Sequence, residues 1–195
     1  HMNDVEVFPS SLRPGVFQPV DVMVSLLNIQ AVMVFDPDTL KIKYVTIGKV
    51  VRQHDPDFID GNRISIFDNN HVASESQGAQ SRIVVMSAKN DQEHVIYSGS
   101  TERPFYTNVM GKHQWLPNGN ILIVESKKGR AFEIDAEGAL VWEYFHLVDR
   151  GRLALLTEAE RLPPFFTSSF FMEGRQRCGK ARSAGESTAR MSPID

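Results

Sequence analysis

Two histidines, His54 and His113, are the residues of this sequence best suited to chemistry. Imidazole has a pKa of about 6.5, so near neutral pH it can act as a nucleophile, a base or an acid. Arg52, Lys112 and Arg103 lie close enough in the sequence to supply positive charge for an anionic group. The pattern therefore favours group transfer at a site that binds a small anion.

An internal repeat places both histidines on matching elements. Asp60-Gly61-Asn62 precedes an apolar run, and Asn118-Gly119-Asn120 precedes a second one. His54-Asp55 and His113-Gln114 stand several residues before these turns, and Asn3-Asp4 is the weaker first copy. Both histidines are thus expected near the start of the first strand of a repeat.

Each copy has the pattern of a four-stranded meander. Asp-Gly and Asn-Gly favour tight turns, because glycine adopts positive φ without steric cost, and the short β-branched runs between turns predict strands. A single four-stranded sheet cannot cover both of its faces, so the copies are expected to stack as blades of a β-propeller, with their leading strands around a central channel. The prediction is an all-β fold with about three four-stranded antiparallel blades at 1–49, 50–110 and 111–148. A β-sandwich is the main rival, although it would not require the copies to resemble each other.

Three blades would leave two open flanks. Propellers usually close with about four to eight blades, and apolar sheet faces are costly to expose. The chain is therefore expected either to be half of a larger ring or to form a homo-oligomer through its open blade faces. A collapsed packing of three sheets is the alternative.

The C-terminal region departs from the repeat. Residues 149–172 are expected to be a packing segment, with a short helix over Arg152–Leu162 and a phenylalanine cluster against a blade. The cluster consists of Phe165, Phe166, Phe170 and Phe171. Residues 173–195 form a polar tail rich in Gly, Ser, Arg and Lys, a composition typical of disorder.

The charge balance excludes some partners. There are 21 basic and 24 acidic residues, giving a formal charge of −3 and no electrostatic case for nucleic acid or an anionic membrane. No apolar run is long enough to span a bilayer. His1-Met2 is typical of a cloning remnant, so a signal peptide could have been removed and the compartment stays open.

No metal or other cofactor is expected. The single cysteine, Cys178, cannot form an intrachain disulfide or build a structural zinc site. His71 and His94 lack partners at metal-ligand spacing. The acidic segment 55–62 fails the calcium-loop pattern, because Ile59 occupies a required oxygen-ligand position.

Structural roles are weighed beside the catalytic ones. A repeated histidine at a strand start is also typical of a residue that joins a blade to its neighbour. Arg82 and Arg130 stand at equivalent places in two copies, and salt bridges between blades are the favoured explanation for them.

The sequence resembles the arylsulfotransferase family over roughly residues 3 to 166, and is similar to the C-terminal half of such a protein. The residues that carry the resemblance are Arg52–Phe58, Asp60-Gly61-Asn62 with Phe67-Asp68-Asn69, Leu116–Ile123 and Val141–Tyr144. The Asn-Gly-Asn element occurs in several propellers, and the His-Asp segment before it makes the match more specific.

The resemblance implies a six-bladed propeller that moves a sulfuryl group from an aryl sulfate to a phenol through a sulfohistidine. It implies a periplasmic or secreted location and no cofactor. Carried onto this chain, His54 and His113 match the channel-facing histidines, and Arg52 or Lys112 matches the anion clamp. Asn3 stands where the other copies have histidine. A non-catalytic binding module and an inactive fragment are the alternatives.

Overall fold

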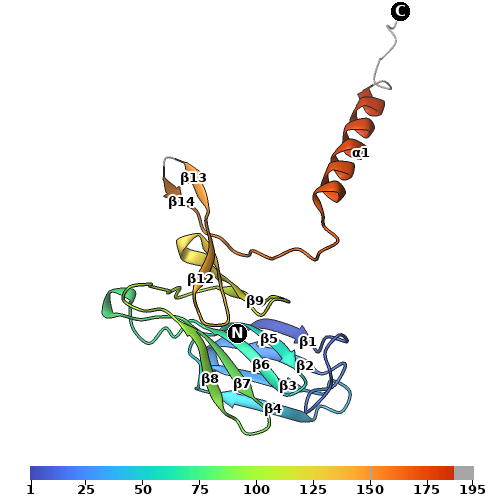
Figure 1. Cartoon of the computed structure of the whole chain (residues 1–195). Coiled ribbons are helices and arrows are strands. Elements are labelled where there is room, and N and C mark those ends of the chain that lie inside the picture. The colour runs from blue at the N-terminus through green and yellow to red at the C-terminus, as the bar shows by residue number, and fades with distance from the viewer. Residues whose placement is uncertain (150, 187–195) are drawn as a thin grey trace, which may run out of the picture. The chain divides into compact units, whose positions relative to one another are not determined.

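The structure, a computed structural model, describes residues 1–149 and 151–186. The chain divides into two compact units, residues 1–160 and 161–195. The first unit contains three four-stranded antiparallel sheets, here blades 1 to 3, with the strands of each in chain order (Figure 1). Blade 1 is β1 (Met2–Val7), β2 (Val22–Leu26), β3 (Ala31–Phe35) and β4 (Ile42–Ile47). Blade 2 is β5 (His54–Asp60), β6 (Arg63–Asp68), β7 (Arg82–Ser87) and β8 (Glu93–Ser98). Blade 3 is β9 (Lys112–Trp115), β10 (Ile121–Glu125), β11 (Arg130–Ile134) and β12 (Leu140–Phe145).

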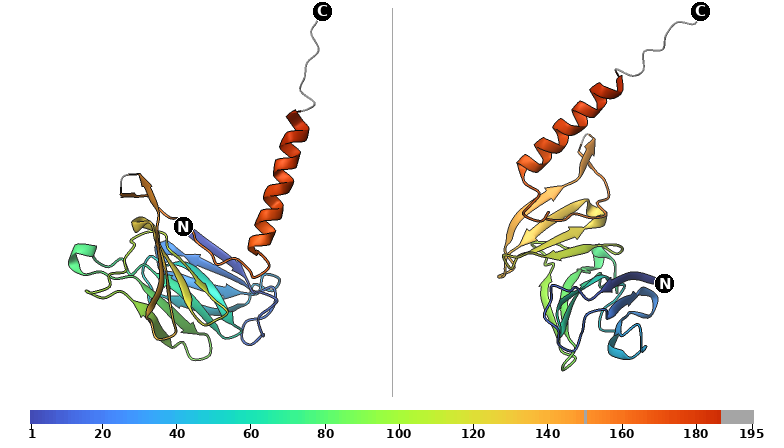
Figure 2. Two further views of the ribbon diagram at one scale, coloured as in Figure 1. Left: turned by 45° about the horizontal axis from the view of Figure 1, so that its top comes forward. Right: turned by 90° about the vertical axis from the view of Figure 1, so that its right-hand side faces the viewer.

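This arrangement confirms the prediction of an all-β, propeller-type fold. The leading strands lie together, with β5 in contact with β1 on one side and with β9 on the other. The last strands, β4, β8 and β12, carry many of the exposed apolar side chains, and so does β1. The three blades do not close a ring within the described part of the chain (Figure 2).

Alternation along each strand builds a separate apolar layer on either side of blade 2. On β6, Ile64 and Ile66 pack against blade 1, whereas Phe67 packs against blade 3. This is the period-two pattern that a sheet buried on both faces requires. The layer between blades 1 and 2 is built from Phe8, Phe17, Met23, Val32, Val34, Tyr44, Val50, Phe58, Ile64, Ile66, Val84 and Met86. The layer between blades 2 and 3 is built from Phe67, Ile83, Phe105, Ile121, Ile123, Phe132 and Ile134.

The two flanks of the stack differ. In blade 1, Val5, Val7 and Ile47 are exposed, so association with another copy through this blade stays a prediction. The outer face of blade 3 is covered by the chain itself, because Leu156 and Ala159 pack on its buried apolar residues.

The segment that covers blade 3 corrects the expected helix over Arg152–Leu162. The structure has a hairpin of β13 (Leu147–Asp149) and β14 (Arg152–Leu153), and residues 154–160 then run without regular structure. The backbone N–H groups of Ala154 and Leu156 donate to the carbonyls of His146 and Ser126, at 2.9 and 3.1 Å. These bonds to blade 3 replace the bonds between successive turns that a helix would need.

The two glycines of the repeated turns serve different purposes. Gly119 has φ of 87°, as expected for a tight turn. Gly61 is not in the left-handed region and instead allows a close approach of two loops. A Cβ atom at this position would lie 2.2 Å from the backbone nitrogen of Gly15. The Gly61 carbonyl also accepts a hydrogen bond from the N–H of Phe17 at 2.8 Å.

The second unit contains helix α1 (Ser168–Glu186), which corrects the expectation that the chain is disordered from residue 173. Thr167 Oγ1 accepts the backbone N–H of Phe170 at 3.2 Å, which caps the helix start. The helix then continues through straight-chain residues with high helix propensity, such as Glu173 and Gln176. Residues 187–195 of the predicted tail lie outside the described residues.

The phenylalanines of this unit pack on each other, with ring centroids 4.2 Å apart for Phe165 and Phe166 and 5.0 Å apart for Phe166 and Phe170. Their packing against a blade stays a prediction. In the described part of the chain, no helix is both long and apolar enough to cross a membrane.

Candidate functional site

His54 stands at an irregular point of the innermost strand of blade 2. Arg52 and Asp55, on either side of it, have left-handed backbones with φ of 60° and 49°. His54 is paired with Phe67, and the register of β5 against β6 then shifts before Asp57. Such conformations are uncommon for residues with a side chain and tend to occur at functional sites. The bulge sets the direction of the side chains that follow His54.

A buried acid paired with an arginine occurs at the same place in blades 2 and 3. Asp68 on β6 accepts Arg82 Nε at 2.9 Å, and Glu125 on β10 accepts Arg130 Nη1 at 3.2 Å. Arg130 also donates to Glu143 of the same blade, at 2.6 Å. The expectation of salt bridges between blades is therefore wrong, because each arginine ties together neighbouring strands of its own sheet.

These acid–arginine pairs also show that the two histidines are not structurally equivalent. The residue before the acid is Phe67 in blade 2, paired with His54, and Val124 in blade 3, paired with Lys112. His54 therefore corresponds to Lys112, and His113 stands one residue later in its copy, so the expected match of the two histidines is wrong by one residue. A shift of one residue turns a side chain to the other face of its sheet. His54 thus lies on the face that blade 2 turns toward blade 3, and His113 on the face that blade 3 turns toward blade 2.

His113 joins blade 3 to blade 2. Its Nδ1 lies 3.0 Å from Asp55 Oδ2, and its backbone N–H donates to the same oxygen at 2.6 Å. Its Nε2 lies 2.7 Å from Ser65 Oγ, which also accepts the indole N–H of Trp115 at 2.9 Å. The order serine, histidine, aspartate resembles a hydrolase triad, but Ser65 is fully buried and already occupied. The contacts are those of a residue that fixes two blades together.

The carboxylates around His113 have opposite pKa shifts. Burial would raise the pKa of Asp55, but the hydrogen bonds from His113 and the charges of His113 and Lys112 lower it. Lys112 Nζ lies 3.0 Å from Asp55 Oδ1. Burial raises the pKa of Asp57 to about 6, and the charge of Asp55 contributes to this rise. Burial likewise raises the pKa of Glu6 to about 8.

These groups open onto a cleft of about 300 Å³ near the leading strands. Its lining is largely acidic, with two aromatic side chains. The lining residues are Glu6, Asp55, Asp57, Phe58, Lys112, His113, Gln114, Trp115, Glu158, Ala159 and Glu160.

Replacing Glu6 tests the electrostatics of this cleft. The pKa of Glu6 is about 8 in the folded chain, against an ordinary value of 4.5. The folded state therefore retains a proton that the unfolded state releases, and the free energy of unfolding falls as pH rises through this window. Glutamine carries no charge and keeps an oxygen for the backbone N–H of Phe58, which lies 2.9 Å from Glu6 Oε2. We expect Glu6→Gln to stabilise the protein by about 1–2 kcal/mol near pH 9 and by nothing near pH 4.

Urea unfolding at the two pH values measures this difference. Glu137→Gln, in the exposed turn before β12, is the control and should show no dependence on pH. An equal gain from Glu6→Gln at both pH values would contradict the electrostatic explanation.

Asp55, Asp57 and His113 are also the described residues that could hold a metal ion. One ligand atom from each lies within 4.8 Å of the others. The sequence indicated no such set, because His113 stands 58 residues from Asp55. Both Asp55 oxygens already accept protein donors, one from Lys112 and the other from His113. The cluster is thus neutralised within the protein, and we assign no metal to it.

His54 has a different environment. It is half-buried, and its Nδ1 lies 2.8 Å from Asn69 Oδ1 and 3.1 Å from the carbonyl oxygen of Arg52. The Arg52 side chain is exposed in the preceding turn. Arg103 is exposed on the loop after β8, where its backbone N–H donates to Ser100 Oγ at 3.1 Å. Among the described residues, no hydrogen bond or ion pair joins Arg103 to either histidine. Among the described residues, the structure therefore joins the side chains of Lys112 and His113 through Asp55, and it joins His54 to the backbone of Arg52.

Comparison with known proteins places the chain in a family. The sequence model of the family described as Arylsulfotransferase (ASST) matches residues 1–147, which is more than half of the chain. The chain belongs to the arylsulfotransferase family. No curated protein matches it.

Among solved structures, this arylsulfotransferase-family chain matches apo AztD from Citrobacter koseri. The TM-score is 0.39 at 10% sequence identity, over 64% of this chain and 31% of that chain. The chain thus spans about a third of the length of that structure, and so weak a likeness carries no argument about function.

Proposed function

We propose that the chain takes part in sulfuryl transfer from an aryl sulfate to a phenol, with His54 as the residue that carries the sulfuryl group. The proposal is carried by the family match together with the open side of the His54 ring. Both ring nitrogens of His113 have a protein partner, whereas only Nδ1 of His54 does among the described residues. A nucleophile needs a nitrogen lone pair that is free to attack.

In the proposed reaction, a His54 nitrogen attacks sulfur, and the N–S bond forms as the S–O bond to the leaving phenol breaks. The acceptor phenol then attacks the same sulfur, the N–S bond breaks, and the phenolic proton passes to His113, which gave its own proton to the leaving phenolate. Arg52 and Lys112 are the proposed cations for the sulfuryl oxygens. Arg103 stays a prediction from the sequence alone.

His113 is the proposed partner of the leaving phenolate. Its burial would lower the pKa, but the hydrogen bond that it donates to Asp55 and the charges of Asp57 and Asp55 raise it. The raised pKa favours the imidazolium form, and His113 is one of the residues that line the cleft. A positively charged imidazole can supply the proton that a departing phenolate takes up, and for this His113 would have to give up its bond to Asp55 or to Ser65.

The test is the transfer of the sulfuryl group from 4-nitrophenyl sulfate to phenol, and the release of 4-nitrophenol measures its rate. We expect His54→Gln to lower the rate by about 10³-fold or more, because it removes the nucleophile. His94→Gln is the matched control, since His94 is exposed on the outer strand β8 and should leave the rate unchanged. Mass spectrometry of the protein quenched during turnover should place the sulfuryl adduct on the peptide that contains His54.

Transfer at the unchanged rate by His54→Gln, or an adduct on another residue, would overturn the proposal. Sedimentation of the same sample shows whether the active species is a monomer or a larger assembly. The proposed partners are thus a small aromatic sulfate, a phenol and a second copy of the chain.

A non-catalytic binding module is the second candidate, and the contacts of His113 favour it. Because His113 joins two blades, a purely structural role predicts that His113→Gln lowers stability. If the chain is a non-catalytic binding module, no transfer would be detected with the unmodified chain, and His54→Gln would leave ligand binding unchanged.

A further inference from the structure

We infer that Asn69 is a positioning residue that fixes the tautomer of His54 and leaves Nε2 as the nucleophilic atom. The assignment of the tautomer stands on hydrogen-bond geometry alone. The role of Nε2 in attack rests on the proposed sulfuryl transfer.

The orientation of the Asn69 amide follows from its partners. Asn69 is fully buried directly after β6. Its Nδ2 lies 2.8 Å from the carbonyl oxygen of Thr107 and 2.7 Å from that of Met110. Carbonyl oxygens only accept hydrogen bonds, so the NH₂ group of the amide must face them. The amide oxygen is then left to face His54.

The protonation of the His54 ring follows in turn. Its Nδ1 lies between two acceptors, Asn69 Oδ1 at 2.8 Å and the carbonyl oxygen of Arg52 at 3.1 Å. Neither can donate a proton, so Nδ1 must carry the hydrogen. In the neutral imidazole the second nitrogen, Nε2, then holds the lone pair. No hydrogen bond to Nε2 is found among the described residues, which leaves that lone pair available for attack.

Asn69 is itself held by the loop that leads into blade 3. Its own carbonyl oxygen lies 3.3 Å from Ser81 Oγ, and the same hydroxyl accepts the backbone N–H of Thr107 at 3.0 Å. The amide therefore cannot rotate without losing its bonds to Thr107 and Met110. The packing of blade 3 on blade 2 thus keeps one tautomer of His54.

Nitrogen NMR of the histidine rings tests the tautomer directly. In the neutral form of the His54 ring in the unmodified protein, we expect Nδ1 to be protonated and Nε2 to be unprotonated. Asn69→Ala should raise the population of the other tautomer, because Oδ1 is lost and only the more distant carbonyl oxygen of Arg52 still accepts from Nδ1. Asn70→Ala is the control, since the Asn70 amide donates to the carbonyl oxygen of Gln80 at 3.0 Å and should leave the His54 signals unchanged.

A protonated Nε2 in the unmodified protein would overturn the inference without the need for any variant. The spectrum also decides the tautomer if sulfuryl transfer proves absent, so failure of the two proposals can be distinguished. If transfer occurs, Asn69→Ala should lower kcat by about 10–100-fold at a temperature where it remains folded. An unchanged kcat in Asn69→Ala, with His54→Gln inactive, would contradict the positioning role.

Discussion

Asp55→Asn should lower the free energy of unfolding by about 3 kcal/mol, since it removes the central charge of a buried network. The Asp55 carboxylate accepts Lys112 Nζ on one oxygen and two donors of His113 on the other. Asparagine has one acceptor oxygen, so its NH₂ group would face either the ammonium or the imidazole. Lys112 and His113, which are partly and fully buried, would then compete for the single amide oxygen as their hydrogen-bond acceptor.

Asp57→Asn is the matched control on the same strand, and it should have the opposite effect. The pKa of Asp57 is raised to about 6 from 3.8, so its charge opposes folding as pH rises through this window. We expect the free energy of unfolding to be unchanged near pH 4 and to rise by about 1–2 kcal/mol near pH 8. Urea unfolding followed by tryptophan fluorescence measures both variants. Equal losses from Asp55→Asn and Asp57→Asn at pH 8 would show that burial alone, rather than the position of the charge, decides their effect.

The sheets could be predicted from the sequence because the repeat is local. Each strand run, such as Ile121–Glu125, carries its own turn signals and its own alternation. The alignment of the copies was harder to predict. The two turns are 58 residues apart and align His54 with Lys112, whereas matching the two histidines takes 59 residues, so the match of residue types gave the wrong register. The strand pairing beside the buried acids also aligns His54 with Lys112.

The composition of the site was harder to predict because its members are far apart in the chain. Lys112 and Asp55 are separated by 57 residues, and no spacing rule relates them. Asn69 did leave a signal, since it lies in the Phe67-Asp68-Asn69 segment that carries the family resemblance. Its role depends on the backbone of Thr107 and Met110, whose carbonyl groups give no pattern in the sequence.

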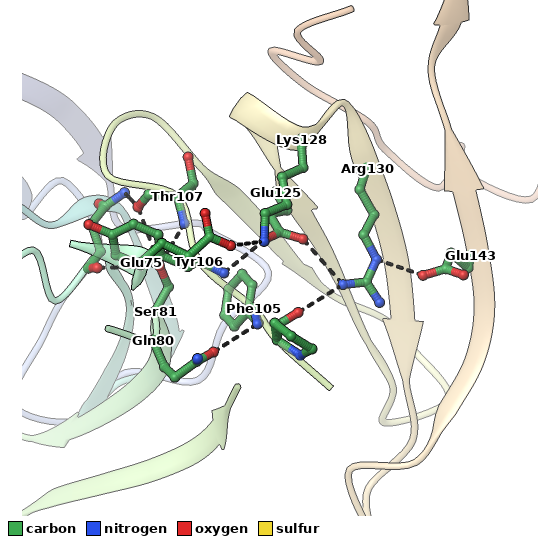
Figure 3. A network of polar contacts seen from close by, with 12 residues as sticks. Glu75, Gln80, Ser81, Phe105, Tyr106, Thr107, Glu125, Lys128, Arg130 and Glu143 are labelled. Carbon is green, nitrogen blue, oxygen red and sulfur yellow. Dashed lines mark hydrogen bonds and ion pairs between the residues drawn. The ribbon is translucent and has the colours of Figure 1, made fainter. Parts of the chain in front are cut away.

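Glu125→Ala should lower the free energy of unfolding by about 3–5 kcal/mol. Figure 3 shows that Glu125, the last residue of β10, faces the loop that leads into blade 3. Its side chain is fully buried, and Oε1 accepts the backbone N–H of Tyr106 at 2.8 Å. Lys128 Nζ and Arg130 Nη1 each lie 3.2 Å from its carboxylate. Alanine would leave a buried N–H without an acceptor and two cations without their shared partner.

Glu143→Ala is the control that separates this effect from the loss of any carboxylate beside Arg130. Glu143 Oε1 accepts Arg130 Nε at 2.6 Å, but its side chain is 32% exposed. Exposed ion pairs contribute little, so we expect this variant to lose at most about 1 kcal/mol in urea unfolding followed by circular dichroism. Equal losses from the two variants would mean that Arg130 is held by β12 rather than by the buried acid. Blade 3 would then depend on its outer strand, and the loop that holds Asn69 in place would have no anchor in Glu125.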